Sequence, residues 1–314
     1  EAVRNELRAM LSGDPFYPMQ LARRRAWFGK RHPRATSLQQ QLDNLDGITP
    51  DSVREYRERH YRAGATLVVV AGDFGGSAGQ RGLARLLRQV RRHAPLPPGT
   101  AVPYPPPPER APPPQRWPEL RVPSAAASSC RVSVDFRTGL LWGSEASLAL
   151  RLAMAVLTSG FDSRLYRELR SERGLVYFVA ADVSSHARDP RLSTASLTSE
   201  CVPQNAKEVL GRMRAALKAL AGPEPPTHDE MRRVRSALEV ELLDMSQDHS
   251  PERLAAEYGQ FLLKTGEVRG AADALHALGN VQGDDVSRAV SDLMRSGGTL
   301  IVCGGEEGGD AERQ

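Results

Sequence analysis

The order of apolar and polar positions predicts a mainly helical first part that ends in one strand and a further helix. Residues 1–12 and 17–29 have helical character. Thr49 is a suitable N-cap, and Pro50 follows it at the first helical position, so a helix is predicted to begin there. The apolar segment ATLVVVAGDF, residues 65–74, predicts a buried strand. The apolar stripe of a last helix then follows, made of Leu83, Leu86, Leu87 and Val90.

The second part of the chain mixes strands and helices. CRVSVDF at 130–136 alternates as a half-buried strand does, and 144–157 is an apolar helix. The segments at 175–185 and 191–200 are joined by HARDP and resemble a hairpin. Further helices are predicted from an apolar stripe between Ala206 and Leu217 and from starts at Thr227, Ser250 and Asp284. A strand at 299–303 completes an α+β pattern.

A proline-rich segment separates the two parts. Residues 95–118 contain 12 of the 23 prolines, which excludes a helix and favours extended polyproline II. We therefore expect a partial first domain at 1–94, a linker at 95–117, a second domain at 118–305 and a mobile tail at 306–314.

The ends of the two expected domains resemble each other. Residues 51–72 and 284–305 share seven identities at a constant offset of 233 positions, and both read as a helix, a short turn and a strand. Chance similarity between helix–strand units is the alternative. If the repeat is real, the chain contains two related α/β-sandwich domains with antiparallel-rich sheets. The same offset places the start of the first domain about 115 residues before Glu1, so that domain is truncated at its N-terminal side.

Composition excludes several classes of function. Hydrophobic residues make up 40% and charged residues 25%, as in globular proteins. The net charge is +4, but the basic residues are interspersed with acids, so we expect no nucleic-acid partner. No apolar run reaches the length of a membrane helix, and we expect no membrane partner. The three cysteines are far apart and lack a CxxC pair, so buried packing roles are predicted for them.

Two segments carry a resemblance to a known family. LTSGFDSRLYRELRSERGLVYFVAADVS, residues 157–184, resembles the second-domain signature of the insulinase/pitrilysin zinc metallopeptidases. The segment at 49–74 resembles the end of that family's first domain, and EAVRNEL at 1–7 resembles its helix with the third zinc ligand. The resemblance covers most of the chain and implies two related α+β domains, with Glu6 as the zinc ligand.

The zinc-binding motif of this family is missing from the sequence. Neither H-x-x-E-H nor H-E-x-x-H occurs, and the seven histidines are isolated from one another. A zinc site needs three or four ligands, so Glu6 cannot hold the metal by itself. We therefore expect zinc in the intact enzyme, with its histidine ligands upstream, and no tight binding to this chain.

The resemblance also implies substrate-binding roles for Arg170 and Tyr177. A guanidinium can donate several hydrogen bonds to peptide carbonyl groups, and a phenol can donate to a carbonyl oxygen that gains charge. The alternative for Arg170 is a surface ion pair with Glu168 or Glu172. The alternative for Tyr177 is packing within a strand.

The function implied by the resemblance is zinc-dependent endopeptidase activity on unfolded or short peptides. This chain alone would be inactive and would bind an extended peptide at a sheet edge. The alternative is a non-catalytic, substrate-binding partner subunit of a heteromeric family peptidase. For either function, a homodimer or heterodimer with a family member is the expected assembly. The sequence leaves the compartment open between bacterial cytoplasm and periplasm.

Overall fold

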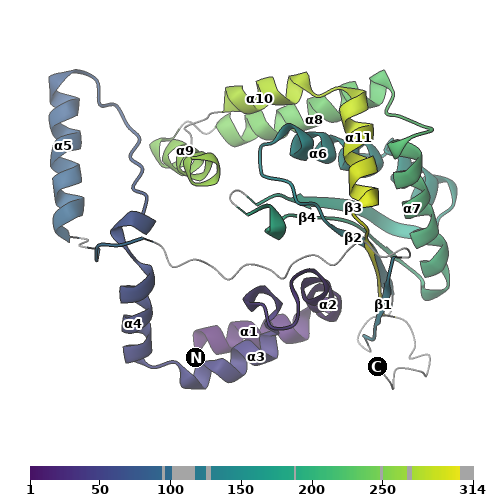
Figure 1. Cartoon of the computed structure of the whole chain (residues 1–314), viewed down its shortest axis with the longest axis horizontal. Coiled ribbons are helices and arrows are strands. Elements are labelled where there is room, and N and C mark those ends of the chain that lie inside the picture. Colours follow the sequence, from purple (N-terminus) through teal and green to yellow (C-terminus); the bar gives the residue numbers. More distant parts are fainter. Residues whose placement is uncertain are drawn as a thin grey trace.

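The computed structural model describes residues 1–93, 96–100, 117–124, 129–186, 189–247, 250–266 and 271–304. The expected tail at 306–314 and the greater part of the expected linker, residues 101–116, lie outside these ranges. The described part forms three layers, with helices on both sides of one sheet (Figure 1). Among the described helices, none combines the length and the apolar character that a membrane crossing requires.

The sheet has five strands in the order β1-β5-β2-β4-β3. The β1–β5 pair is parallel, and the other three pairs are antiparallel. The α+β class with an antiparallel-rich sheet is thus confirmed. The strands are β1 (Glu119–Val122), β2 (Cys130–Arg137), β3 (Val176–Ser184), β4 (Thr194–Cys201) and β5 (Thr299–Cys303).

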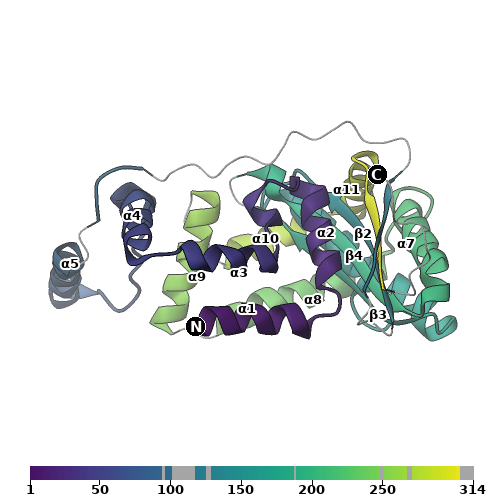
Figure 2. The same cartoon turned by 90° about the horizontal axis from the view of Figure 1, so that it is seen from below.

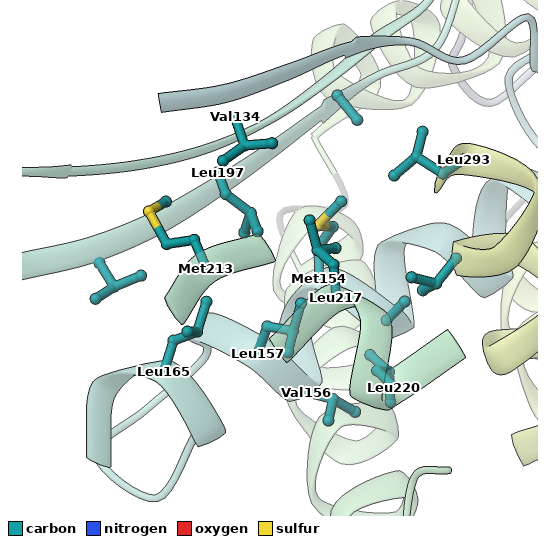
Figure 3. Close-up of a cluster of buried hydrophobic side chains, with 14 of the residues drawn as sticks. Val134, Met154, Val156, Leu157, Leu165, Leu197, Met213, Leu217, Leu220 and Leu293 are labelled. Atoms are coloured by element: carbon teal, nitrogen blue, oxygen red, sulfur yellow. The ribbon is translucent and has the colours of Figure 1, made fainter. Parts of the chain in front are cut away.

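One face of the sheet carries the main apolar core. Val134 of β2 and Leu197 of β4 are directly opposite each other and point toward the helices (Figure 3). They meet fully buried side chains such as Leu157 and Leu217, and burial of each large apolar side chain stabilises the fold by roughly 1.5–3 kcal/mol. The helices of this part are α6 (Glu145–Thr158), α7 (Ala206–Ala221), α8 (His228–Gln247), α9 (Pro251–Thr265), α10 (Ala271–Asn280) and α11 (Gly283–Arg295).

The opposite face of the sheet is polar along β2 and β4. Strand alternation places Arg131, Ser133 and Asp135 on this face, where helix α2 (Tyr17–Phe28) covers part of it (Figure 2). Phe16, which precedes α2, and Met19 bury the apolar end of the face against Ile301 and Cys303. The N-terminal helices therefore form the third layer.

The other N-terminal helices are α1 (Ala2–Gly13), α3 (Leu38–Asn44), α4 (Pro50–His60) and α5 (Gly76–His93). Helix α1 packs against α3, whereas α4 and α5 lie apart from the sheet in both views (Figures 1 and 2). The predicted start at Thr49 is confirmed, because its side chain accepts a hydrogen bond from the backbone N–H of Ser52. The predicted helices at 1–12 and 17–29 also form.

The strand predicted at 65–74 is wrong. Residues 63–65 form a 3-10 turn, and the following residues run without a strand partner in the described chain. Leu67 and Val68 are 38% and 51% exposed, so the apolar run is not buried. A single strand needs a neighbour to satisfy its backbone groups. The second copy of the proposed repeat forms helix α11 and strand β5, whereas the first forms helix α4 and no following strand. The described residues therefore contain the expected helix, turn and strand in the second copy alone.

Candidate functional site

Strand β3 forms one edge of the sheet. It pairs with β4 on one side, and no strand of the described residues pairs with its other side. The β3–β4 register shifts between Val176 and Phe178, which leaves Tyr177 in a bulge. Bulges reorient side chains, and the Tyr177 side chain is indeed 60% exposed. Tyr177 therefore does not pack within the sheet.

Arg170 lies beside Tyr177 in space. It belongs to a π-helical turn, Tyr166–Glu172, that leads into β3 through Gly174, whose φ is +61°. The Nη1 atom of Arg170 donates hydrogen bonds to the backbone carbonyl oxygens of Val176, at 3.3 Å, and of Tyr177. The structure thus brings the two residues together at the start of an edge strand, with Arg170 exposed.

The acidic neighbours of Arg170 pair with other arginines. Glu168 accepts a hydrogen bond from Arg212 at 2.6 Å, and Glu172 lies 3.5 Å from Arg167. Among the described residues, Arg170 therefore does not form the surface ion pair considered for it with Glu168 or Glu172. Its guanidinium lies instead 5.8 Å from the centre of the Tyr166 ring, a cation–π contact.

The aromatic surface extends beyond Tyr166. The ring centres of Tyr166 and Phe161 are 5.3 Å apart in an edge-on arrangement. Phe161 is 78% exposed, the largest exposure among the large hydrophobic residues that the structure describes. Phe161, Tyr166, Arg170 and Tyr177 together offer donors and apolar contact area beside an unpaired strand edge.

The loop that carries Phe161 is fixed by another arginine of the same segment. Arg164 donates hydrogen bonds to both carboxylate oxygens of Glu230, each at 2.7 Å, and to the carbonyl oxygens of Glu224 and Pro225. The ion pair is largely buried, with side-chain exposures of 16% and 19%. Arg164 therefore joins the segment just before the π-helical turn to the start of α8.

Glu6 does not lie in a metal-binding cluster. It is exposed on α1, and no group of three histidine, cysteine or carboxylate side chains gathers anywhere in the described residues. The residues present do not fit a zinc ion, which needs at least three protein ligands.

Sequence reasoning missed a buried ion pair below α2. The Asp135 side chain is fully buried and lies 3.1 Å from Nε of Arg23, while Ser133 donates a hydrogen bond to it at 2.9 Å. Burial raises the pKa of Asp135 to about 6, although Arg23 and Ser133 act in the opposite direction. The alternation in CRVSVDF identified the polar face but not the helix that covers it.

Comparisons with known proteins identify the family. The family model described as "Peptidase M16 inactive domain" matches residues 47–238. No curated protein matches the chain. Among solved structures, a peptidase M16 inactive domain from Pseudomonas fluorescens is 16% identical with a TM-score of 0.72, and the match covers 100% of this chain and 71% of that chain.

Two further structures share the fold. A conserved protein from Enterococcus faecalis is 14% identical with a TM-score of 0.69, over 98% of this chain and 68% of that one. A protease from Helicobacter pylori is 15% identical with a TM-score of 0.68, over 93% of this chain and 71% of that one. The family model covers more than half of the residues. The chain therefore belongs to the M16 peptidases, the insulinase family, and corresponds to their inactive-domain region.

Proposed function

We propose that this chain is the peptide-binding part of an M16 zinc endopeptidase, and that it holds an extended or unfolded peptide along the free edge of β3. The observation that carries the proposal is the pairing of Arg170 with Tyr177 at the bulged start of that edge. The catalytic zinc would belong to another segment or another chain, because the donors described here do not form a zinc site.

The unpaired edge of β3 is suited to binding peptides of many sequences. An unpaired edge presents backbone N–H and C=O groups that an added strand can pair with. Such pairing depends on the backbone groups of the bound peptide and not on its side chains. Enzymes that act on unfolded peptides need this tolerance.

The two side chains supply direction and position. Arg170 uses Nη1 for the carbonyl groups of β3, and its remaining N–H groups face an exposed surface where a peptide carbonyl can accept from them. The Tyr177 hydroxyl is a second donor on the same strand. Both would act beside the peptide bond that the metal-bearing part cleaves.

The proposal is tested by peptide binding to the chain itself. A fluorescently labelled, unstructured peptide is titrated with wild-type protein and with Tyr177→Phe, and anisotropy gives the dissociation constant. Removal of the hydroxyl is expected to weaken binding by about fivefold, since one hydrogen bond contributes about 1 kcal/mol. Arg170→Lys, which keeps the charge but loses the planar fork, is expected to weaken binding by a similar factor.

Matched variants control for general surface effects. Tyr56 on α4 is 59% exposed, against 60% for Tyr177, so Tyr56→Phe removes an equally exposed hydroxyl elsewhere. Arg167 lies in the same π-helical turn as Arg170, so Arg167→Lys makes the same side-chain change at a neighbouring position and serves as its control. Equal affinities of the Tyr177 and Tyr56 variants would refute the proposed site.

A non-catalytic partner subunit is the second candidate, because a match to an inactive domain is compatible with both arrangements. In this case the H-x-x-E-H motif lies on a different polypeptide, with which the chain forms a heterodimer. Reading the full open reading frame distinguishes the two functions. In either assembly, Tyr177→Phe should lower turnover while zinc content stays unchanged, and equal loss of both would contradict a substrate-binding role.

A further inference from the structure

Two cysteines that are 71 positions apart in the sequence lie directly opposite each other in the sheet. Cys130 is the first residue of β2, Cys201 is the last residue of β4, and the antiparallel register pairs them. Both thiols are free and buried on the same face of the sheet, at 1% and 0% exposure. Opposite residues in antiparallel strands have Cα atoms about 4.5–5.5 Å apart, which falls within the 4.4–6.8 Å that a disulfide spans.

From this register we propose that Cys130 and Cys201 are a modification site, a thiol pair that a peroxide oxidises to a cross-strand disulfide. The third cysteine is not part of it. Cys303 pairs with Arg131 in the register of β2 and β5, so its side chain lies on the opposite face, among Phe16, Met19 and Ile301. Cys303 is therefore a built-in control with similar burial.

The environment divides the chemical roles between the two sulfurs. Cys201, acting as hydrogen-bond donor, lowers the pKa of Cys130 below that of an ordinary thiol, while Cys130 and burial raise the pKa of Cys201. Cys130 is thus the more easily ionised nucleophile, and Cys201 keeps its proton.

The reaction balances with one peroxide. The Cys130 thiolate attacks a peroxide oxygen, the O–O bond breaks, and hydroxide leaves, which gives a sulfenic acid. The Cys201 sulfur then attacks the Cys130 sulfur and forms the S–S bond. The S–O bond breaks, and the released hydroxyl takes the Cys201 proton to leave as water.

The position of the pair allows reagents to reach it. Both residues lie at strand ends, where local opening costs less than opening the middle of a sheet. On its other side, Cys201 lies opposite Val176 of β3, the residue before Tyr177. A disulfide here would tie β2 to β4, the strand that pairs with β3 and its Tyr177.

The test uses the purified chain before and after hydrogen peroxide, with alkylation of the remaining thiols under denaturing conditions. The three cysteines fall in three separate tryptic peptides: VPSAAASSCR, LSTASLTSECVPQNAK and SGGTLIVCGGEEGGDAER. We expect alkylatable thiols to fall from three per chain to one, with the first two peptides linked and Cys303 alkylated. Dithiothreitol should restore all three.

Variants separate this result from unspecific oxidation. Cys303→Ser should form the same linked peptide, and Cys201→Ser should not. Three thiols that persist in peroxide, a linkage that includes Cys303, or sulfinic acid at Cys130 without a linked peptide would each overturn the assignment. The assay involves no peptide ligand, so its outcome is independent of the proposed function.

Discussion

The guanidinium of Arg170 donates a hydrogen bond to the backbone carbonyl oxygen of Tyr177. One side chain of the π-helical turn thereby fixes the start of the edge strand that follows it, and it remains exposed at the same time. The contact gives Arg170 a structural role in holding β3, beside the substrate-binding role proposed for it. Stability and peptide affinity are therefore both informative for variants at this position.

Replacement of Arg170 by Ala should destabilise the fold by about 1 kcal/mol, because an exposed charged hydrogen bond to two carbonyl groups is lost. Urea denaturation followed by circular dichroism measures the change. Arg167→Ala should change the free energy of unfolding by less than about 0.5 kcal/mol, because Arg167 forms a solvated pair with Glu172. Equal effects of both variants would argue against the contact.

Gly174 allows the turn between the helix and β3. Its φ of +61° lies in the left-handed region, and a Cβ atom added there would meet nothing within 4 Å. Gly174→Ala should therefore cost about 1–2 kcal/mol of stability from backbone conformation alone. Gly211, inside helix α7 and equally open, is the control. Gly211→Ala should instead stabilise by about 0.5–1 kcal/mol, because alanine favours the helix.

Asp135 should make stability depend on pH. Its pKa is about 6 in the folded chain against 3.8 in the unfolded one, so the folded state binds the proton more tightly. The resulting stabilisation is complete below pH 3.8 and is lost as pH rises through 6. The difference between the folded and unfolded pKa values of Asp135 corresponds to about 3 kcal/mol of folding free energy, at 1.36 kcal/mol per pKa unit.

The comparison with Asp135→Asn isolates this contribution from those of other groups. The free energy of unfolding of both proteins is measured between pH 4 and 8. The value for wild type minus the value for the variant should fall as the pH rises across that range. In contrast, Arg23→Met removes the cation that lowers the pKa of Asp135 and stabilises its ionised form. The Arg23→Met variant should therefore lose more stability at pH 8, where the carboxylate is ionised, than at pH 4. A difference curve that is flat with pH would contradict burial of Asp135.

The Arg164–Glu230 pair should be the most sensitive ion pair of this region. Arg164→Ala leaves a largely buried carboxylate without its partner, and we expect a loss of about 3 kcal/mol. Arg151→Ala breaks a more exposed pair with Glu241 and should cost less than about 1 kcal/mol. Thermal melts of the two variants give the comparison, and similar melting temperatures would contradict it.

The local signals in the sequence correctly predicted most elements. The cap at Thr49, the alternation at 130–136 and the apolar segment at 144–157 each form the expected helix or strand. The failure at 65–74 has a clear physical reason, because a strand depends on a neighbour that local pattern cannot supply. Helices α3 and α10 and strand β1 were not predicted.

The sequence by itself determined the family, the α+β class and the two residues proposed to bind peptide, because a signature segment and strand periodicity are local properties. Only the tertiary structure decided which distant residues meet. Register brought Cys130 opposite Cys201, and the docking of α2 buried Asp135 beside Arg23. Such contacts depend on how strands pair and layers pack, and these arrangements are set by the burial of the whole chain and not by the residues adjacent in sequence.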